Sequence, residues 1–546
     1  MIRLSEIKLT LAQAEQAEAP LRSAAAGILG LSESELASVQ VFKRSFDARK
    51  AELMAVYIVD VALADAARED TLLATLADRP HIGRTPDMEW RPPVQLREPI
   101  SQRPVVVGFG PCGILAALVL AQMGLRPIVL ERGKKVRERT KDTWGLWRRR
   151  ILDPESNVQF GEGGAGTFSD GKLYSQIKDP RHLGRKVMTE FVKAGAPEEI
   201  LYVAHPHIGT FRLVKMVENM REQITALGGE IRFQHRVVDL LVEDTTDGRQ
   251  VRGLSVLDQA TGTVIELHAE HVVLALGHSA RDTFEMLHRR GVFMEAKPFS
   301  IGFRVEHPQG VIDRARWGRH AGHPLLGAAD YKLVHHASNG RSVYSFCMCP
   351  GGTVVAATSE PQRVVTNGMS QYSRNERNAN AGMVVGIEPR DYPGGPLAGV
   401  ELQRRLESKA FELGGGDYNA PGQLVGDFIA GRPSSQLGDV EPSYKPGVTL
   451  GDLHEALPSY AVAALREALP VFGRKIKGFD MPGAVLTGVE TRTSSPLKIT
   501  RGEAYQSLNV RGLYPAGEGA SYAGGILSAG IDGIKVGEAV ARSLVA

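Results

Sequence analysis

Three glycine-rich segments contain the residues whose types and spacing point most directly to chemistry. In the first, Gly108, Gly110 and Gly113 follow the pattern G-x-G-x-x-G after a short apolar run, and Glu131 ends the next apolar run. The first glycine permits a tight turn, the second lets a pyrophosphate approach the backbone, and the third lets a helix pack on a strand. A carboxylate at position 131 suits ribose hydroxyls and disfavours a 2′-phosphate. The pattern predicts FAD or NAD, and a tight turn without a ligand is the alternative.

The second segment, GLYPAGEGASYAGGIL, favours FAD over NAD. It predicts a strand, a glycine turn containing Gly517, Glu518 and Gly519, and a helix that begins near Gly525. Glu518 can reach the ribityl chain or the phosphates, and the amino end of the helix would stabilise negative charge on the flavin ring. A nicotinamide domain has no need of this element. A closely packed buried helix is the alternative.

The third segment, NVQFGEGGAGTFSDGKL, is dense in glycine. Such density lets a backbone wrap closely around a large planar or phosphorylated ligand because no Cβ intervenes. The apolar residues Phe160, Phe168 and Leu173 argue against the alternative of a flexible surface loop. The cofactor contacts that we expect from the whole sequence are Gly108, Gly110, Pro111, Gly113, Glu131, Arg132, Gly161, Gly163, Gly164, Thr167, Gly171, Lys172, Leu173, Val237, Ala275, Gly277, Gly517, Glu518, Gly519, Gly524, Gly525 and Ile526.

Candidate catalytic residues lie outside these glycines. In SFCMCPGG, Cys347 and Cys349 share one face of the strand if it is extended, which allows a redox pair that exchanges electrons with a flavin. Two small core residues are the alternative that the C-x-C spacing favours. In TGVETRTSSP, Glu490 and Arg492 can orient a substrate or position a proton donor, and a polar surface strand is the alternative. His278 is a further candidate near the cofactor edge.

The elements that must position these residues form three units. Residues 1–95 predict a small α/β domain of alternating strands around an Ala-rich helix. From residue 100 the order strand, glycine turn, helix, strand predicts a parallel sheet. We therefore expect an α/β fold: a discontinuous Rossmann-like FAD-binding domain over 100–285 and 480–546, with an inserted α+β substrate domain over 286–479.

The composition limits the classes of partner that we expect this protein to bind. The 546 residues carry a formal net charge of only +3, spread along the chain, so no basic surface for nucleic acid or anionic lipid is predicted. The longest apolar run is too short to span a bilayer, and the first residues lack the apolar core of a signal peptide. The 3 cysteines are too few for a disulfide framework, and no closed set of four ligands predicts a metal. We expect a cytoplasmic protein with a small-molecule substrate, whose oligomeric state stays open.

Several motifs together resemble a known family. They are GFGPCG with Glu131, FGEGGAGTFSDGKL, HPHIGT, ALGHSARDT, GFRVEHPQ, SFCMCPGG, TGVETRTSSP and YPAGEGASYAGGILSAGIDG. The chain is similar to bacterial FAD-dependent dehydrogenases of uncertain reaction within the glutathione-reductase-like flavoprotein superfamily. The resemblance covers nearly the whole chain and implies a discontinuous FAD domain, an inserted substrate domain and FAD contacts at the matching glycines. It implies no particular substrate.

These observations favour a soluble FAD-dependent oxidoreductase that transfers hydride to or from an unknown small molecule. No second strand-GxGxxG-helix unit is found, so NAD(P)H is expected only as a transient reductant. Two alternatives remain open. One is a flavin monooxygenase-type enzyme, and the other is an FAD-stabilised scaffold without turnover. Modification of RNA is disfavoured by the weak net charge.

Overall fold

A five-stranded parallel sheet carries the first glycine motif in the computed structural model, which describes residues 1–49 and 52–545. Its order is β22-β11-β5-β6-β7, and every neighbouring pair of strands is parallel. Apart from the half-buried edge strand β7, these strands are short, mainly apolar and buried on both faces, which is typical of parallel sheets. The predicted α/β fold class is confirmed. The strands are β5 (Val105–Val107), β6 (Ile128–Glu131), β7 (Glu230–Phe233), β11 (Val272–Leu274) and β22 (Leu513–Pro515).

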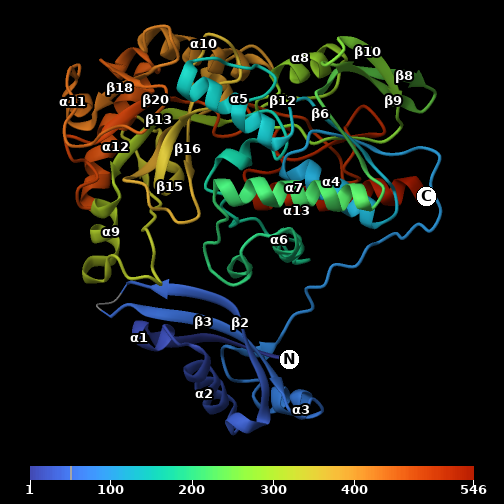
Figure 1. The fold of residues 1–546 in the computed structure, drawn as a ribbon, viewed down its shortest axis with the longest axis vertical. Coiled ribbons are helices and arrows are strands. Elements are labelled where there is room, and N and C mark those ends of the chain that lie inside the picture. The colour runs from blue at the N-terminus through green and yellow to red at the C-terminus, as the bar shows by residue number, and fades with distance from the viewer. Residues whose placement is uncertain (50–51, 546) are drawn as a thin grey trace.

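Helices cover one face of this sheet, where Val106, Val129 and Val273 belong to one apolar core (Figure 1). The central helix of the layer is buried along its whole length and is apolar all round, as a helix in the middle of a layer must be. Small residues let the last helix of the chain run close against it. The helices of this layer are α4 (Pro111–Gln122), α6 (Leu183–Lys193), α7 (Thr210–Ala226) and α13 (Ile526–Val545).

A three-stranded antiparallel meander covers the opposite face of the sheet. Val105, Val107 and Leu130 share its apolar core, because neighbouring residues of a strand point to opposite faces. The meander and its helix are β8 (His235–Thr245), β9 (Gly248–Asp258), β10 (Thr263–His268) and α8 (Arg281–Arg289). The helix that precedes the third glycine segment is α5 (Val136–Arg149), and a short pair of strands is β12 (Glu295–Ala296) with β21 (Leu497–Lys498).

A second, eight-stranded sheet forms the inserted unit. Its strands are β13 (Phe299–Pro308), β14 (Val334–His336), β15 (Ser342–Ala356), β16 (Thr366–Ser370), β17 (Asn378–Ile387), β18 (Ala420–Leu424), β19 (Val448–Leu450) and β20 (Val485–Glu490). Its helices are α9 (Gln309–Trp317), α10 (Ala398–Leu413), α11 (Val425–Ala430) and α12 (Ser459–Lys475). Strand β20 pairs with β13 and β18, so this sheet extends past the boundary that we placed at residue 479. The irregular and Gly/Pro-rich stretches that indicate the inserted unit end before β20, whereas β20 joins the sheet through pairing with strands that are distant in the sequence.

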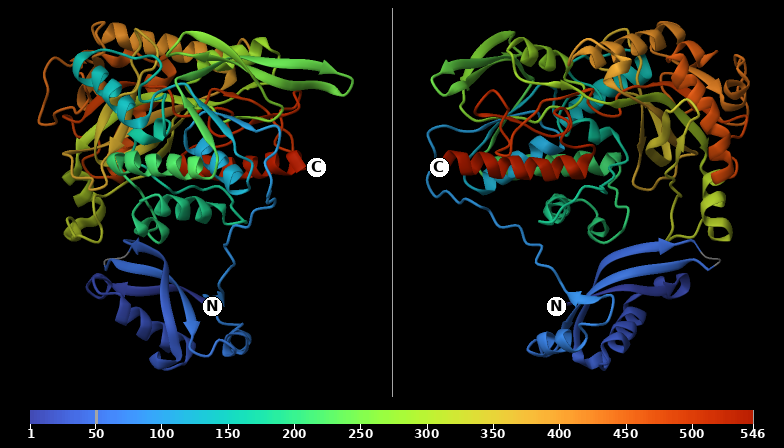
Figure 2. Two further views of the ribbon diagram at one scale, coloured as in Figure 1. Left: turned by 45° about the vertical axis from the view of Figure 1, so that its right-hand side comes forward. Right: turned by 180° about the vertical axis from the view of Figure 1, so that it is seen from behind.

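The amino-terminal unit is a four-stranded antiparallel sheet with helices on one face, joined to the rest by an extended segment (Figures 1 and 2). Its sheet contacts the larger body through Arg44, whose amide donates to the carbonyl of Tyr202 at 2.6 Å, while the amide of Ala204 donates to the Arg44 carbonyl at 2.9 Å. The elements of the unit are β1 (Ile2–Thr10), α1 (Leu11–Ala14), α2 (Glu18–Leu29), β2 (Leu36–Asp47), β3 (Met54–Leu63), α3 (Arg68–Thr75) and β4 (Ile82–Arg84).

In the part of the chain that the structure describes, no helix combines the length and the apolar character that crossing a membrane requires.

The contact between α4 and α13 depends on glycine. A Cβ at Gly533 would lie 2.2 Å from the carbonyl oxygen of Cys112. Gly533→Ala should therefore push the two helices apart and lower the free energy of unfolding by about 1–3 kcal/mol. Urea unfolding would measure this loss. Gly502→Ala is the control, because no atom lies within 4 Å of the Cβ that it adds. Equal stability of the two variants would contradict the close contact.

Candidate cofactor and active site

A cavity of about 470 Å³ lies at the carboxyl ends of β5, β6 and β11. In parallel sheets, ligands bind at this edge where the strand order reverses. The reversal here lies beside β5, because β6 and β7 are on one side of it and β11 and β22 are on the other. The cavity lining includes parts of all three glycine-rich segments, which are far apart in the sequence.

Two glycines of the first motif are required by the fold itself. Gly108 has a φ of +100°, and a Cβ there would lie 2.4 Å from the carbonyl oxygen of Ala275. A Cβ at Gly113 would lie 1.9 Å from the carbonyl oxygen of Gly108. These contacts give the tight turn and the close approach of helix to strand that the spacing predicts.

Gly110 is different, because the protein leaves room beside it. The protein atom nearest to an added Cβ is the Cα of Gly164 at 3.5 Å, an ordinary contact, and its φ is −86°. Gly110 precedes α4 without a side-chain cap, and the amides of the first turn of a helix have no partners within the helix. These amides, with the partial positive charge of the helix end, form an anion site at the cavity wall.

The fold does not require glycine at three further positions that line the cavity. Gly277, Gly524 and Gly525 have no protein atom within 4 Å of an added Cβ, and none has a positive φ. With Gly110, they keep side chains out of space that the protein itself does not fill. A ligand that fills this space would explain glycine at all four positions, so the residues present fit a bound dinucleotide such as FAD.

The third glycine segment is an ordered part of the interior. Arg139 of α5 is fully buried, and its guanidinium donates to the carbonyl of Asn157 at 2.7 Å, of Val158 at 2.6 Å and of Glu162 at 2.8 Å. The sequence around Arg139 is rich in cations and predicts a solvated basic face, so this buried role was missed. The interpretation as a flexible surface loop is excluded, because Gly161 packs on this side chain.

Glu131 joins the first and third segments. Its carboxylate accepts hydrogen bonds from the amides of Phe109 at 2.9 Å, Gly133 at 2.8 Å and Gly161 at 3.1 Å. A carboxylate has about four acceptor sites, so one stays free for a hydroxyl of a ligand. The adjacent Arg132 is held by ion pairs with Glu155 and Asp282.

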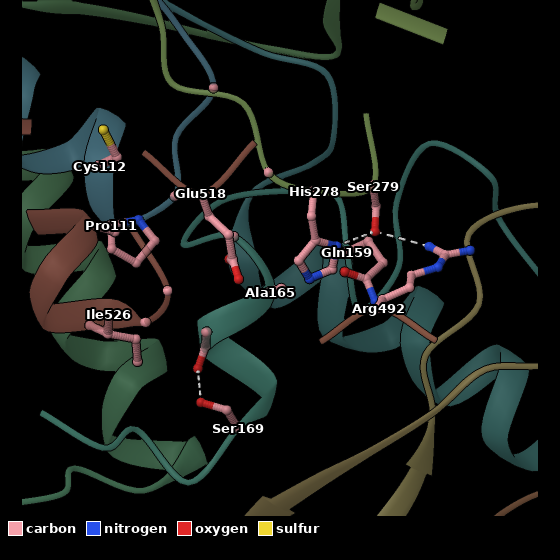
Figure 3. Close-up of a pocket in the computed structure, with 18 of the residues that line it drawn as sticks. Pro111, Cys112, Gln159, Ala165, Ser169, His278, Ser279, Arg492, Glu518 and Ile526 are labelled. Atoms are coloured by element: carbon pink, nitrogen blue, oxygen red, sulfur yellow. Dashed lines mark hydrogen bonds between the residues drawn. The ribbon is translucent and has the colours of Figure 1, made fainter. Parts of the chain in front are cut away.

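Glu518 lies in the cavity between the start of α4 and His278 (Figure 3). Burial raises the pKa of Glu518 to about 7, although the ammonium of Lys297 opposes this shift. A carboxyl group with this pKa is partly protonated at neutral pH, so it can either donate a hydrogen bond to a ligand or accept one. On the same side, Gly524, Gly525 and the first residue of α13, Ile526, present a second helix amino end to the cavity.

His278 and Arg492 form the opposite wall with Ser279 (Figure 3). The hydroxyl of Ser279 lies 3.0 Å from His278 Nδ1 and accepts from Arg492 Nη1 at 3.0 Å. Burial, together with the charge of Arg492, lowers the pKa of His278 to about 3, so this ring is neutral. Arg492 also donates to Glu407 at 3.0 Å from both Nε and Nη2, which holds its guanidinium in place.

The residues that we expected to be catalytic do not all lie in the cavity. Cys347 lines the cavity with His278 and Arg492, whereas Glu490 and Cys349 lie behind its wall. Glu490 is buried against Arg304, which donates to its carboxylate at 2.6 Å. This ion pair occupies the group that we expected to orient a substrate.

Most of the expected cofactor contacts do line the cavity, and six lie behind the lining. These six support the loops instead: Gly113 and Gly519 pack on backbone carbonyls, Gly163 on Thr167, and Gly517 on Cys112, while Leu173 is in the core. Sequence reasoning missed Tyr331, whose buried hydroxyl has no hydrogen-bond partner in the described part of the chain. The residues that line the cavity are Gly108, Gly110, Pro111, Glu131, Arg132, Gly161, Gly164, Gly171, Lys172, Val237, Ala275, Gly277, Glu518, Gly524, Gly525 and Ile526.

Comparisons with known proteins show what this chain is similar to. Residues 298–493 match the family model described as FAD-dependent protein, C-terminal domain-like, and residues 1–62 match a domain of unknown function. An uncharacterised protein of Clostridium beijerinckii is 48% identical over 513 residues, which are 93% of either chain.

Solved structures are more distant. Quinol fumarate reductase of E. coli is 14% identical with a TM-score of 0.36, over 82% of this chain and 71% of that one. The 3-ketosteroid-Δ4-(5α)-dehydrogenase of Rhodococcus jostii is 13% identical with a TM-score of 0.36, over 83% of this chain and 100% of that one.

The wall of the cavity depends on one buried carboxylate. Glu407 of α10 pairs with both Arg281 and Arg492, and burial opposes its ionisation while the two cations lower the pKa of Glu407 well below its usual range. Glu407→Gln leaves buried guanidinium charge uncompensated and should cost about 3–5 kcal/mol of unfolding free energy. Urea unfolding at pH 7 measures this.

Glu401→Gln on the same helix is the matched control. The Glu401 side chain is 57% exposed and pairs with Arg404 at the surface, so its loss should cost at most about 1 kcal/mol. The contribution of Glu407 is present above the ordinary Glu pKa and is lost as the pH falls below it, so the two variants should converge in acid. Equal stability of the variants at pH 7 would overturn the buried role of Glu407.

Proposed function

Since this chain belongs to a family of FAD-dependent bacterial proteins, we propose that it binds FAD in the cavity described above and acts as an oxidoreductase on a small molecule. The observation that carries the proposal is the set Gly110, Gly277, Gly524 and Gly525. At each of these positions the cavity is kept open although the fold has no need of glycine. A dinucleotide lying against the backbone is the ligand that such a lining suits.

The chain offers a separate group to each part of the cofactor. The first turn of α4 offers the amide of Cys112 to the pyrophosphate, and the helix end offers positive potential. The free acceptor site of Glu131 suits a ribose hydroxyl. Glu518, which can donate or accept, suits the hydroxyls of the ribityl chain. The amino end of α13 suits the flavin ring, where it stabilises negative charge.

Bound FAD supplies two-electron transfer, and the protein supplies position and electrostatics. The substrate half of the cavity is lined by Tyr331, Phe346 and Met348 from the eight-stranded unit and by Lys172. The unpartnered Tyr331 hydroxyl and the Lys172 ammonium are donors on this wall, which suits a substrate that carries acceptor oxygens. The neutral His278 ring can bind a substrate without adding charge.

The proposal also includes the location of the protein in the cell and its electron donor. We place the protein in the cytoplasm, and the free thiols of Cys112, Cys347 and Cys349 support a reducing compartment. We propose NAD(P)H only as a transient electron donor. The stopped-flow experiment distinguishes this proposal from the two alternatives, a flavin monooxygenase and an inactive scaffold.

The first experiment compares two glycines of one motif. Gly110→Ala should fold normally but lose bound flavin by about tenfold or more, because its Cβ meets open space that the pyrophosphate needs. Gly113→Ala should instead lower stability, because its Cβ meets the Gly108 carbonyl. Flavin absorbance per protein and the unfolding midpoint are measured for both. Full retention of flavin in Gly110→Ala would contradict the placement.

The second experiment tests turnover by anaerobic stopped flow. The rate at which NADH or NADPH reduces the bound flavin should rise in proportion to the concentration of the nucleotide, because the chain has no second strand-GxGxxG-helix unit to bind it tightly. Saturation at micromolar nucleotide would contradict this. Oxygen consumption tightly coupled to substrate oxidation would favour the monooxygenase, and a flavin that no donor reduces would favour the scaffold.

A further inference from the structure

Cys347 and Cys349 lie on the two sides of one cavity wall. Cys347 lines the cavity, whereas Cys349 is fully buried behind it. The two are nonetheless in contact, since the Cys349 thiol donates to the Cys347 carbonyl at 3.4 Å. Cα atoms two residues apart lie within about 7 Å, which is close to the span that a disulfide bridges.

A bulge in β15 places Cys347. Phe346 pairs with Gly382 and Cys349 pairs with Asn380, so β15 has one residue more than β17 between these pairs. Cys347 lies in the bulge with a φ of +46°, a conformation that a residue with a side chain rarely adopts. The expectation that both cysteines lie on one extended face is therefore wrong. Strained conformations of this kind concentrate at functional sites.

The charges around the pair distinguish its two thiols. The hydrogen bond from Cys349 lowers the pKa of Cys347, and the cations of Arg304 and Lys172 lower it further against the effect of burial. The same hydrogen bond and burial raise the pKa of Cys349. Arg304 is fixed at this place, since Nη1 donates to the Cys347 carbonyl at 2.8 Å. Because the thiolate is the reactive form, Cys347 is the thiol prepared to attack.

A small molecule can reach Cys347 from solvent. The cavity lining includes Tyr174, which is 44% exposed, and the exposed Lys332. The segment around Lys332 lies beside β15, because the amide of Ser345 donates to the Leu333 carbonyl at 3.0 Å. The entrance near Lys332 is therefore on a segment next to the strand that carries the thiol, and Lys172 adds an ammonium that attracts anionic groups.

We propose that Cys347 and Cys349 are a redox-active dithiol that reduces small anionic disulfides. The Cys347 thiolate attacks one sulfur of the substrate, the substrate S–S bond breaks, and the first thiolate leaves. Cys349 then loses its proton and attacks Cys347 Sγ, which forms the protein disulfide and releases the second thiolate. Two electrons have passed from the cysteines to the substrate, and the two thiolates take up the two protons.

Only the return of the protein to its dithiol form rests on the proposed function. It requires two electrons and two protons from reduced bound FAD. The half-reaction that reduces the substrate involves the chain's own residues alone, so it can be tested without measuring flavin turnover.

The test uses 5,5′-dithiobis(2-nitrobenzoate), a disulfide with two carboxylates, on the purified holoprotein. The wild type should release two thionitrobenzoates per chain and retain no adduct, and its mass should fall by two hydrogens. Cys349→Ser should release one and retain the adduct at Cys347. Cys347→Ser should react at least about tenfold more slowly, because Cys349 and Cys112 are buried. Peptide mass spectrometry identifies the modified residues.

A stable adduct on wild-type Cys347, or reaction at Cys112 first, would overturn the proposal. The flavin absorbance of each variant separates the two proposals. If the protein contains its full complement of flavin but shows no thiol exchange, only the dithiol proposal is refuted. If the purified wild type contains no flavin, the proposed FAD cofactor is refuted, whatever the thiols do.

Discussion

The close contact of α4 with α13 is the constraint on which the rest of the site depends. Gly533 and Gly537 let α13 lie against α4, and Gly113 lets α4 lie against the turn after β5. Two helices that begin at distant residues thereby direct their amino ends to one cavity. Both ends carry partial positive charge, so an anion bound between them would be stabilised by both. The fold thus prepares an anion site before any side chain contributes charge, and every other group in the cavity is placed relative to it.

A second constraint fixes the inserted unit against this site. Glu407 of α10 binds Arg281 of α8 and Arg492 after β20, and Thr491 donates to the same carboxylate at 2.8 Å. Buried charges that are fully paired specify one arrangement even where they add little stability. Arg492 therefore serves as part of the scaffold that holds His278 and Ser279. The substrate wall and the cofactor wall are consequently held in one geometry.

Much of the cofactor half could be predicted from the sequence, because glycine spacing encodes backbone geometry directly. Gly108 and Gly113 are where the motif requires them, and Glu131 ends β6 as expected. The substrate half could not be predicted, since it depends on tertiary contacts. Arg139 lies in a run of basic residues, which predicts a surface cation, but its side chain is buried among backbone carbonyls. The bulge at Cys347 needs the register of β17, and β20 joins its sheet only through long-range pairing.

The structure also separates two reasons for glycine that the sequence cannot separate. A glycine whose added Cβ would meet backbone, as at Gly108, is needed for folding whether or not a ligand binds. A glycine whose added Cβ would meet nothing, as at Gly277, makes the chain lose more backbone entropy on folding and gives no gain in packing. Where such a residue lines a cavity, as Gly277 does, a ligand that fills the space explains it. Because these positions border the same cavity as the amino ends of α4 and α13, the open space and the positive potential both suit one kind of ligand: a large anionic molecule that lies against the backbone.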